Sequence, residues 1–214
     1  MSETPTLIVI AKHPVAGRVK TRLCPPCTPS ESAEIARAAL DDTIAATATV
    51  RGVRRVLALD GPVDAWHRHG LDVIAQRGDG LADRIAAAFE DVGGPAFLVG
   101  MDTPQLRTVD FDDALAALAD GREAVIGRAS DGGYWGIGLR APDDRVFHEI
   151  PMSVSSTYAA QRTRLEDLGC RIGELSEHRA VDTWSDAIAV AEIAPDTRFA
   201  RAVRHVRAVE ALAR

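Results

Sequence analysis

The sequence predicts an α/β protein with three layers, in which a mostly parallel central sheet carries helices on both faces. Short, continuous apolar runs such as residues 7–10 and 96–100 are typical of strands buried on both sides. Helical segments alternate with these runs along the chain, as in parallel sheets. With 214 residues, 46% of them hydrophobic, the chain can bury a sizeable core. No Gly/Ser-rich or Pro-rich linker divides it. We therefore expect one domain over residues 1–214, with the C-terminal helices (about 185–214) packed on it.

The first half of the chain offers clear start and stop signals. Thr28-Pro29-Ser30-Glu31 has the spacing of a capping box with proline at the first helical position, which predicts a helix reaching about Thr47. Asp60-Gly61-Pro62 is a turn signal. The other elements expected here are strands at 7–10, 53–59, 71–75 and 96–100, a short helix at 63–69 and a helix at 81–92 that Gly93-Gly94-Pro95 ends.

The second half continues the alternation. Glycines between two apolar runs at 132–133 indicate a tight turn, and Pro195 separates the last two helices. We expect helices at 110–119, 155–168, 185–193 and 197–213, strands at 124–127, 134–139 and 170–175, and a short strand end at 181–183.

Four cations follow the first strand closely: Lys12, Arg18, Lys20 and Arg22. Gly17 among them allows the backbone to approach a ligand. Lysine and arginine form strong, charge-assisted hydrogen bonds with phosphate. The spacing is not that of a Walker loop, which needs Gly-Lys-Ser/Thr in sequence. The segment predicts a phosphate-binding loop of another geometry; the alternative is a solvated basic loop.

Two aspartates are candidates for a divalent metal site. Asp102 follows a buried strand directly, where an acid is costly without a partner. Asp182 precedes a predicted helix. Ligands of parallel sheets bind at the carboxyl ends of strands, so distant segments can meet there. Because hard cations prefer carboxylate oxygens, we expect Mg²⁺ or Mn²⁺ at Asp102 and Asp182. The alternative is that each acid caps a turn or a helix.

Asp131-Gly132-Gly133-Tyr134 is a glycine turn flanked by an acid and an aromatic residue. It also lies at the carboxyl end of a predicted strand, which makes it a candidate contact for an acceptor or sugar. Tyr134 and Trp135 could stack on a ligand, although a plain hairpin turn followed by core residues has the same pattern.

Charge and composition exclude several classes of protein. The formal net charge of −6 argues against a nucleic-acid-binding protein. No apolar run is long enough for a membrane span and no signal peptide is evident, so we expect a cytoplasmic protein without a membrane partner. Cys24 and Cys27 have C-x-x-C spacing without a second metal-binding pair, which favours incidental cysteines over a redox or zinc site. Four arginines recur on the last predicted helix, on a solvated face or a basic partner surface: Arg198, Arg201, Arg204 and Arg207.

Taken together, these motifs resemble the DUF2064 family, glycosyltransferase-like proteins of the GT-A superfamily. The resemblance is carried by Ala11-Lys12-His13-Pro14-Val15-Ala16-Gly17-Arg18-Val19-Lys20-Thr21-Arg22-Leu23, Gly100-Met101-Asp102-Thr103-Pro104, Asp131-Gly132-Gly133-Tyr134-Trp135 and Val181-Asp182-Thr183. Residues 20–23 are also similar to guanylyltransferases of coenzyme F420 synthesis. The resemblance implies a nucleotide-binding sheet, a metal-binding acid at Asp102 and a second acid at Asp182.

Three functions remain open. The first is metal-dependent nucleotidyl transfer from an NTP to a small anionic acceptor, which the dense positive charge of the first loop favours slightly. The second is glycosyl transfer from an NDP-sugar, and the third is nucleotide binding by a regulator without catalysis. The residues assigned are Lys20, Asp102 and Asp131 for catalysis; Ala11, Lys12, Gly17, Arg18, Lys20, Arg22 and Asp102 for the nucleotide; Asp131, Gly132, Gly133 and Tyr134 for the acceptor or sugar; and Asp102 and Asp182 for the metal.

Overall fold

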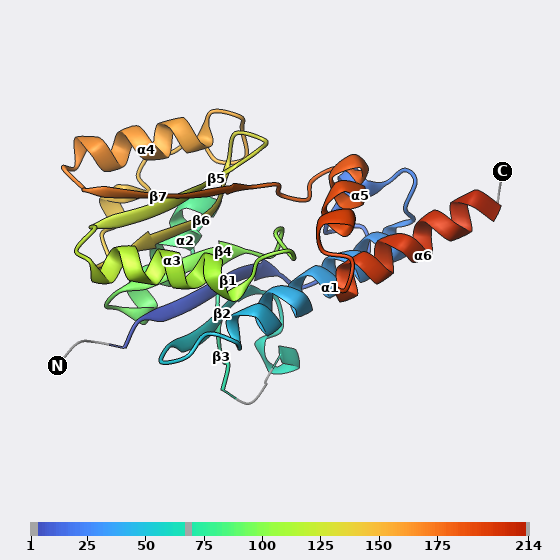
Figure 1. Cartoon of the computed structure of the whole chain (residues 1–214), viewed down its shortest axis with the longest axis horizontal. Helices are drawn as coiled ribbons and strands as arrows, with labels where there is room; N and C mark the ends of the chain where they lie inside the picture. Colours follow the sequence, from blue (N-terminus) through green and yellow to red (C-terminus); the bar gives the residue numbers. More distant parts are fainter. Residues whose placement is uncertain (1–3, 67–69, 213–214) are drawn as a thin grey trace.

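The computed structural model describes residues 4–66 and 70–212 and has a seven-stranded sheet at its centre (Figure 1). The strand order is β3-β2-β1-β4-β6-β5-β7. Every neighbouring pair is parallel except those that β6 forms with β4 and β5. The strands are β1 (Thr6–Lys12), β2 (Arg54–Asp60), β3 (Asp72–Ala75), β4 (Ala96–Gly100), β5 (Ala124–Ala129), β6 (Tyr134–Leu139) and β7 (Ile172–His178).

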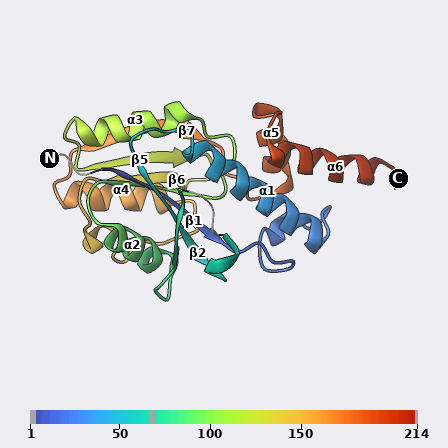
Figure 2. The same cartoon turned by 90° about the horizontal axis from the view of Figure 1, so that it is seen from below.

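Helices cover both faces of this sheet, which confirms the predicted three-layer class (Figure 2). α1 and α3 pack on one face through Leu40 and Phe111. α2 and α4 cover the other face through Phe89 and Leu165. The helices are α1 (Pro29–Thr47), α2 (Leu81–Val92), α3 (Thr108–Ala119), α4 (Thr157–Asp167), α5 (Trp184–Ile193) and α6 (Arg198–Leu212), with short 3-10 turns η1 (Thr21–Leu23), η2 (Val63–Trp66) and η3 (Asp144–Val146).

The capping box predicted before α1 is present. Thr28 Oγ1 accepts a hydrogen bond from the Glu31 amide, and Glu31 Oε2 accepts one of 2.7 Å from the Thr28 amide. These reciprocal bonds satisfy two amides that the first helical turn leaves without a partner. They also lower the pKa of Glu31, chiefly through the backbone bond from Thr28. The box therefore sets the point at which the cationic loop ends and α1 begins.

A third hydrophobic core lies apart from the sheet, where α5 and α6 pack on α1. In both views α6 extends away from the strands (Figures 1 and 2). Phe199 and Val203 of α6 are fully buried against Ile35 of α1. Leu23, at the end of the cationic loop, belongs to the same core. The C-terminal helices therefore pack on α1 and support the loop that follows β1.

Three expected elements differ most from the structure. The helix expected at 63–69 is a 3-10 turn up to Trp66, and residues 67–69 lie outside the described part. The strand expected at 170–175 runs from Ile172 to His178. The strand end expected at 181–183 is irregular chain, because the Val181 amide bonds to the Asp102 carbonyl in a neighbouring loop instead of to a strand.

The arginines of α6 mostly bind groups of the protein itself. Arg198 pairs with Asp42, while Arg201 and Arg204 donate to the carbonyls of Asp196 and Pro195 in the connection between α5 and α6. These three arginines of the expected basic face therefore have intramolecular partners. None of the three cysteines forms a disulfide bond within the described residues. Across the described residues, no helix combines the length and apolar character that a bilayer crossing requires.

Candidate functional site

The candidate site lies at the carboxyl ends of β1 and β4, two neighbouring parallel strands. The register pairs Ile10 of β1 with Gly100 of β4. The loops that leave these strands therefore start side by side, although they lie far apart in the sequence. One carries the predicted cations and the other carries Asp102, so the topology brings the two motifs to one edge of the sheet.

Buried anchors hold the cationic loop in a fixed shape. Val19 is buried in the core between the sheet and α1. Ser32 in the first turn of α1 is fully buried, and its hydroxyl lies 2.6 Å from the Lys20 carbonyl and 3.1 Å from the Val19 carbonyl. Lys20 itself has left-handed backbone, with φ at 48°, which few non-glycine residues adopt. These contacts turn the Lys20 side chain back toward β4.

Two ion pairs join this loop to the two predicted carboxylates. The Lys20 ammonium contacts Asp102 Oδ1 and also donates to the Val181 carbonyl. Its side chain is only 11% exposed, so water screens it weakly. Arg22 Nη1 lies 2.5 Å from Asp182 Oδ2, in a more exposed pair. Residues 20, 22, 102 and 182, chosen separately from the sequence, thus form one cluster of two cations and two acids.

A strap of residues 178–182, which connects β7 to α5, carries Asp182 into this cluster. It runs alongside the loop 102–110 in the opposite direction. The Val181 amide donates to the Asp102 carbonyl at 2.8 Å, and Gln105 Nε2 donates to the Arg179 carbonyl at 2.7 Å. His178 Nε2 lies 2.9 Å from Asp110 Oδ1 at the far end. Three contacts of the loop therefore fix the path of the strap.

Asp110 has a double role in this contact. Its other oxygen accepts a hydrogen bond of 2.7 Å from the Arg107 amide at the start of α3. Burial by itself raises the pKa of Asp110, but the hydrogen bonds from His178 and Arg107 outweigh it, so that the pKa is lowered overall. The carboxylate is therefore ionised near neutral pH. Asp110 is the N3 residue of α3, and its side chain binds the backbone of the N-cap residue.

Neither Asp102 nor Asp182 caps a helix, which was the alternative. The cap of α5 is Thr183, whose Oγ1 accepts from the Asp186 amide in a capping box. Asp182 lies just before that cap. Asp102 lies in a turn well before α3, whose cap is Arg107. Both carboxylates are instead held toward the cationic loop by Lys20 and Arg22.

The other predicted residues of the loop have different surroundings. Gly17 has a φ of 75°, which requires glycine for the turn. Lys12 and Arg18 are exposed, and within the described residues no ion pair holds either of them. Ala11 lies inside β1 with a buried side chain, and its carbonyl accepts 2.8 Å from Gln76 Nε2. The structure does not bring Ala11 into the cluster.

The glycine turn at 131–133 lies at the same edge of the sheet, after β5. One strand separates β5 from β4, so the turn is offset by two strand spacings, roughly 10 Å, from the Asp102 loop. Asp131 Oδ1 accepts 2.8 Å from the Gly133 amide within the turn. The cluster and the turn therefore share one edge without a direct contact between described side chains.

A second loop covers this turn. A Cβ atom at Gly132 would lie 2.1 Å from the Ser155 carbonyl, so only glycine allows the approach. The Tyr158 amide also donates 2.9 Å to the Gly132 carbonyl. Tyr134 points its hydroxyl at Met152 Sδ, and burial raises its pKa, so it stays a neutral phenol. Trp135 is a core residue, as the alternative expected, 4% exposed with its indole N–H on the Ser176 carbonyl.

The donor atoms of the cluster suit a hard divalent cation. Asp102 and Asp182 side chains are 47% and 43% exposed, so each can reach a ligand from solvent. No group of three or more His, Cys, Asp or Glu side chains with metal-site spacing exists in the chain as far as the structure describes it. Magnesium usually takes one or two protein carboxylates and fills its other positions with water and phosphate oxygens. Two carboxylates beside a cationic loop fit that pattern.

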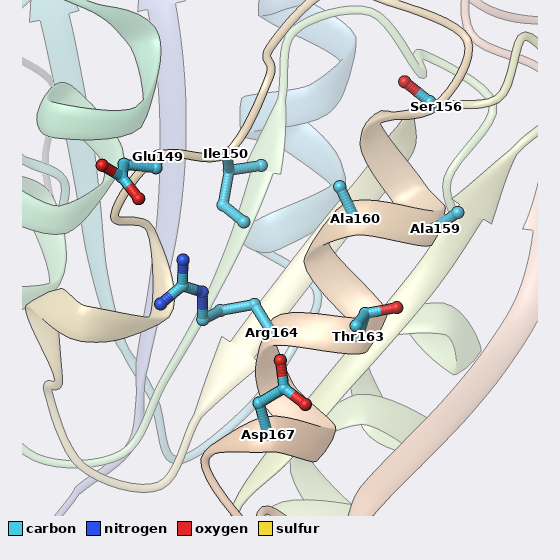
Figure 3. A pocket seen from close by; sticks show the side chains of 8 residues that line it. All are labelled: Glu149, Ile150, Ser156, Ala159, Ala160, Thr163, Arg164 and Asp167. Carbon is cyan, nitrogen blue, oxygen red and sulfur yellow. The ribbon is translucent and has the colours of Figure 1, made fainter.

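Two hollows of the surface lie elsewhere. One, of about 390 Å³, lies between α4 and the loop that carries Glu149 and Ile150, where Arg164 points across it (Figure 3). The other, of about 660 Å³, lies between α2 and residues 142–145. Neither is lined by the cationic loop, Asp102 or the strap, so we do not assign them to the candidate site.

Some residues that shape this edge carry no signal in the sequence. Gln105, Gln76 and His178 each reach a partner that the chain brings near only after folding. Gln76 Nε2 joins the ends of two strands, through the carbonyls of Ala11 and Ala58. His13 stood inside the first motif, but its partner, Trp66, follows in the β2–β3 connection. Pairing across strands could not be read from spacing alone.

Solved structures show the same fold. A protein from Desulfovibrio desulfuricans G20, provisionally described as a nucleotide-diphospho-sugar transferase, shares 26% identity with a TM-score of 0.84, over 99% of this chain and 97% of that one. A CMP:2-keto-3-deoxy-manno-octonic acid synthetase in complex with CTP shares 15% identity with a TM-score of 0.61, over 91% and 100%. Rv0371C from Mycobacterium tuberculosis H37Rv, in complex with manganese, shares 21% with a TM-score of 0.54, over 90% and 100%.

A search of curated proteins finds no relative of this chain. The architecture is nevertheless that of nucleotide-diphospho-sugar transferase-like α/β proteins. A family profile, described as "Uncharacterized protein conserved in bacteria (DUF2064)", matches residues 43–154, which is just over half of the chain. The protein therefore belongs to the DUF2064 family.

Proposed function

We propose that this protein is a nucleotide-dependent transferase that catalyses nucleotidyl transfer from an NTP to a small anionic acceptor. One observation carries the proposal. Lys20 and Arg22 of the loop after β1 meet Asp102 and Asp182, which arrive from β4 and from the strap. A phosphate-binding loop and a pair of carboxylates on one sheet edge are what metal-assisted phosphoryl chemistry requires. The similarity of this fold to that of a CTP-bound synthetase supports the proposal.

The cations have a direct role in this reaction. An acceptor oxygen attacks the α-phosphorus, the bond from that phosphorus to the bridging oxygen breaks, and pyrophosphate leaves. Lys20 and Arg22 bind phosphate oxygens and neutralise the charge that develops on the leaving pyrophosphate, with Lys12 and Arg18 adding to the attraction. Without a nucleotide, the same ammonium and guanidinium are neutralised by Asp102 and Asp182. Binding of a triphosphate thus exchanges one set of partners for another.

The two acids would hold the metal. Mg²⁺ or Mn²⁺ bound by Asp102 and Asp182 would supply further neutralisation of the phosphate charge. A manganese complex of Rv0371C, which shares the fold, supports a divalent ion in this class of protein. The chain itself contributes the fixed path of the strap, since Gln105 and the Asp102 backbone keep Asp182 facing the loop.

Glycosyl transfer from an NDP-sugar is the second candidate. The description of the Desulfovibrio protein favours it. In that case Lys20 and Arg22 bind a diphosphate leaving group, and Asp131 contacts the sugar or acts as base. Nucleotidyl transfer stays ahead because a triphosphate carries more negative charge than a sugar diphosphate, in better balance with four cations.

One incubation separates the two reactions. The protein is supplied with Mg²⁺, each of the four NTPs or a set of NDP-sugars, and a panel of sugar phosphates and phosphorylated hydroxy acids as acceptors. We expect acceptor-dependent release of pyrophosphate from one NTP. Release of free NDP from an NDP-sugar, without pyrophosphate from any NTP, would establish the second candidate instead.

A regulator without catalysis is distinguished by calorimetry. Such a protein would bind nucleotide equally well with Mg²⁺ and with EDTA, and would turn over no acceptor. The proposed transferase should bind nucleotide more weakly in EDTA, because Asp102 and Asp182 would hold a metal ion that neutralises phosphate charge.

A further inference from the structure

His13 lies next to the candidate site, on the opposite side of β1 from Asp102. It directly follows β1, and its amide donates 2.9 Å to the Asp60 carbonyl at the end of β2. The base of its side chain lies against Gly61, which has a φ of 149°. A Cβ at position 61 would lie 2.4 Å from His13 Cβ and 3.3 Å from Cγ, so only glycine leaves room for the histidine. The chain therefore fixes this side chain closely.

Trp66 determines which ring nitrogen of His13 carries the proton. The indole is buried, 1% exposed, and its Nε1–H donates 3.0 Å to His13 Nδ1. An indole N–H can only donate, so Nδ1 must accept. In the neutral ring the proton is then on Nε2. The two rings are nearly perpendicular, at 88°, and Arg37 lies over the indole at 5.2 Å, which holds the donor in place.

The Nε2–H group is left available for a ligand. His13 is half-buried, and among the described residues no protein group bonds to Nε2. A polar group that is partly withdrawn from water without a partner is costly unless a ligand or water completes it. The position matters too. The sheet order places β2 on one side of β1 and β4 on the other, so His13 and the Lys20–Asp102 pair flank the same strand end.

The positions of His13 and Lys20 suggest how the phosphates and the nucleoside of a bound nucleotide are oriented. With its phosphates on Lys20 and Arg22, toward β4, its nucleoside extends across the end of β1 toward β2. We propose that His13 is a nucleoside-binding residue, whose Nε2–H donates a hydrogen bond to an acceptor atom of the base or ribose while Trp66 fixes the tautomer. This inference rests on the proposed function, because it assumes that the loop binds a nucleotide.

Two substitutions of His13 separate its structural contact from its ligand contact. In His13→Asn, the short amide can still accept from Trp66 but presents no donor where Nε2 was. In His13→Gln, the longer amide can place an N–H near the former Nε2. Binding is measured by calorimetry with the four NTPs and Mg²⁺, and with inorganic triphosphate and Mg²⁺. The melting temperature of each variant checks that the fold is retained.

We expect His13→Asn to bind the preferred NTP roughly three- to tenfold more weakly, the size of one hydrogen bond. His13→Gln should recover most of this loss, and inorganic triphosphate should bind all three proteins alike. The nitrogen NMR spectrum of the wild-type imidazole should show the proton on Nε2, and Trp66→Phe should shift it toward a mixture of tautomers.

Equal NTP binding by the wild type and His13→Asn would overturn the inference while leaving the proposed function intact. An equal loss for NTP and for inorganic triphosphate would also overturn it, since His13 would then only shape the phosphate loop. A wild-type protein that binds no nucleotide and no triphosphate would remove the proposed function, and this inference with it.

Discussion

The Val181 amide donates a hydrogen bond of 2.8 Å to the carbonyl of Asp102, joining two segments that carry the two acids of the candidate site. Asp182 follows Val181 directly, so this backbone contact is the one nearest to Asp182 among the three that hold the strap against the loop after β4. Lys20 contacts both segments at once, because its ammonium reaches the Asp102 carboxylate and the Val181 carbonyl. The cluster is therefore one unit, and substitutions within it should not act independently.

Removal of the Asp102 carboxylate tests the metal assignment. Asp102→Asn should lower metal-dependent turnover by roughly 10²–10³-fold, since a group that serves developing charge is lost. The fold should persist because Asp102 is half-exposed and the bond from Val181 uses only its backbone. Asp167→Asn, an exposed acid on α4, is the matched control. Full activity in Asp102→Asn, measured with saturating Mg²⁺, would remove this residue from the site.

Loss of the Lys20 ammonium tests the phosphate loop. Lys20→Ala should weaken nucleotide binding by about 1–3 kcal/mol, the range for a hydrogen bond to a charged group. Arg18→Ala should have a smaller effect, because Arg18 is exposed while Lys20 is 11% exposed and fixed by its backbone. Titration of each variant with the preferred NTP measures both. A larger loss for Arg18→Ala would show that Arg18, and not Lys20, is the main phosphate contact of the loop.

The glycine turn offers a test of the acceptor loops. Gly132→Ala combines a φ of 90° with a contact of 2.1 Å to the Ser155 carbonyl, and should destabilise the protein by about 3 kcal/mol. Gly133→Ala should cost far less, because its new Cβ would meet only the Asp131 carboxylate at 3.2 Å. Urea unfolding of both variants gives the comparison. Equal stabilities would mean that the 155 loop does not pack on the turn.

The free energy of unfolding should depend on pH through Asp110, which binds His178 of the strap. Its pKa in the folded protein is lowered, so its contribution is fully present above the pKa of an unfolded aspartate, near 3.8, and is lost as the pH falls through the folded value. Asp110→Asn should reduce the free energy of unfolding by about 1–3 kcal/mol at pH 7. The difference in free energy of unfolding between Asp110→Asn and the wild type should become smaller below pH 4. Unfolding curves across pH 3–7 test this, with the exposed Asp113→Asn as control.

Gln105 is expected to position Asp182 without touching a ligand. Gln105→Leu keeps the volume of the side chain but removes the hydrogen bond to the Arg179 carbonyl. We expect kcat to fall several-fold while the affinity for inorganic triphosphate stays unchanged, because the cationic loop is intact. A variant with unchanged kcat would show that the backbone bond of Val181 is enough to hold the strap.

Patterns among neighbouring residues predicted several of the helices and strands correctly. The capping box at Thr28, the apolar run at 96–100 and the helix at 81–92 depend on near neighbours, and each is found where it was expected. The convergence of Lys20 with Asp102 also followed from the alternation of strands and helices, since parallel strands end at one edge.

What could not be predicted depends on the order of strands and on contacts across them. The sequence does not reveal that β6 lies between β4 and β5, so the separation of Asp131 from Asp102 was not foreseen. The irregular course of 179–182 was missed because its hydrogen bonds go to a loop rather than to a strand. The role of a side chain such as His13 depends on partners from distant segments of the sequence, in this case Trp66.

The third core joins the cationic loop of the candidate site to α6, which follows it by about 175 residues in the sequence. Leu23, just after the cationic loop, shares this core with Phe199 and Val203 of α6. During synthesis, β1 and its loop emerge long before the helix that buries Leu23. The ribosome must therefore release α6 before Lys20 and Arg22 gain their lasting support, so the candidate site would be completed late in the folding of this domain.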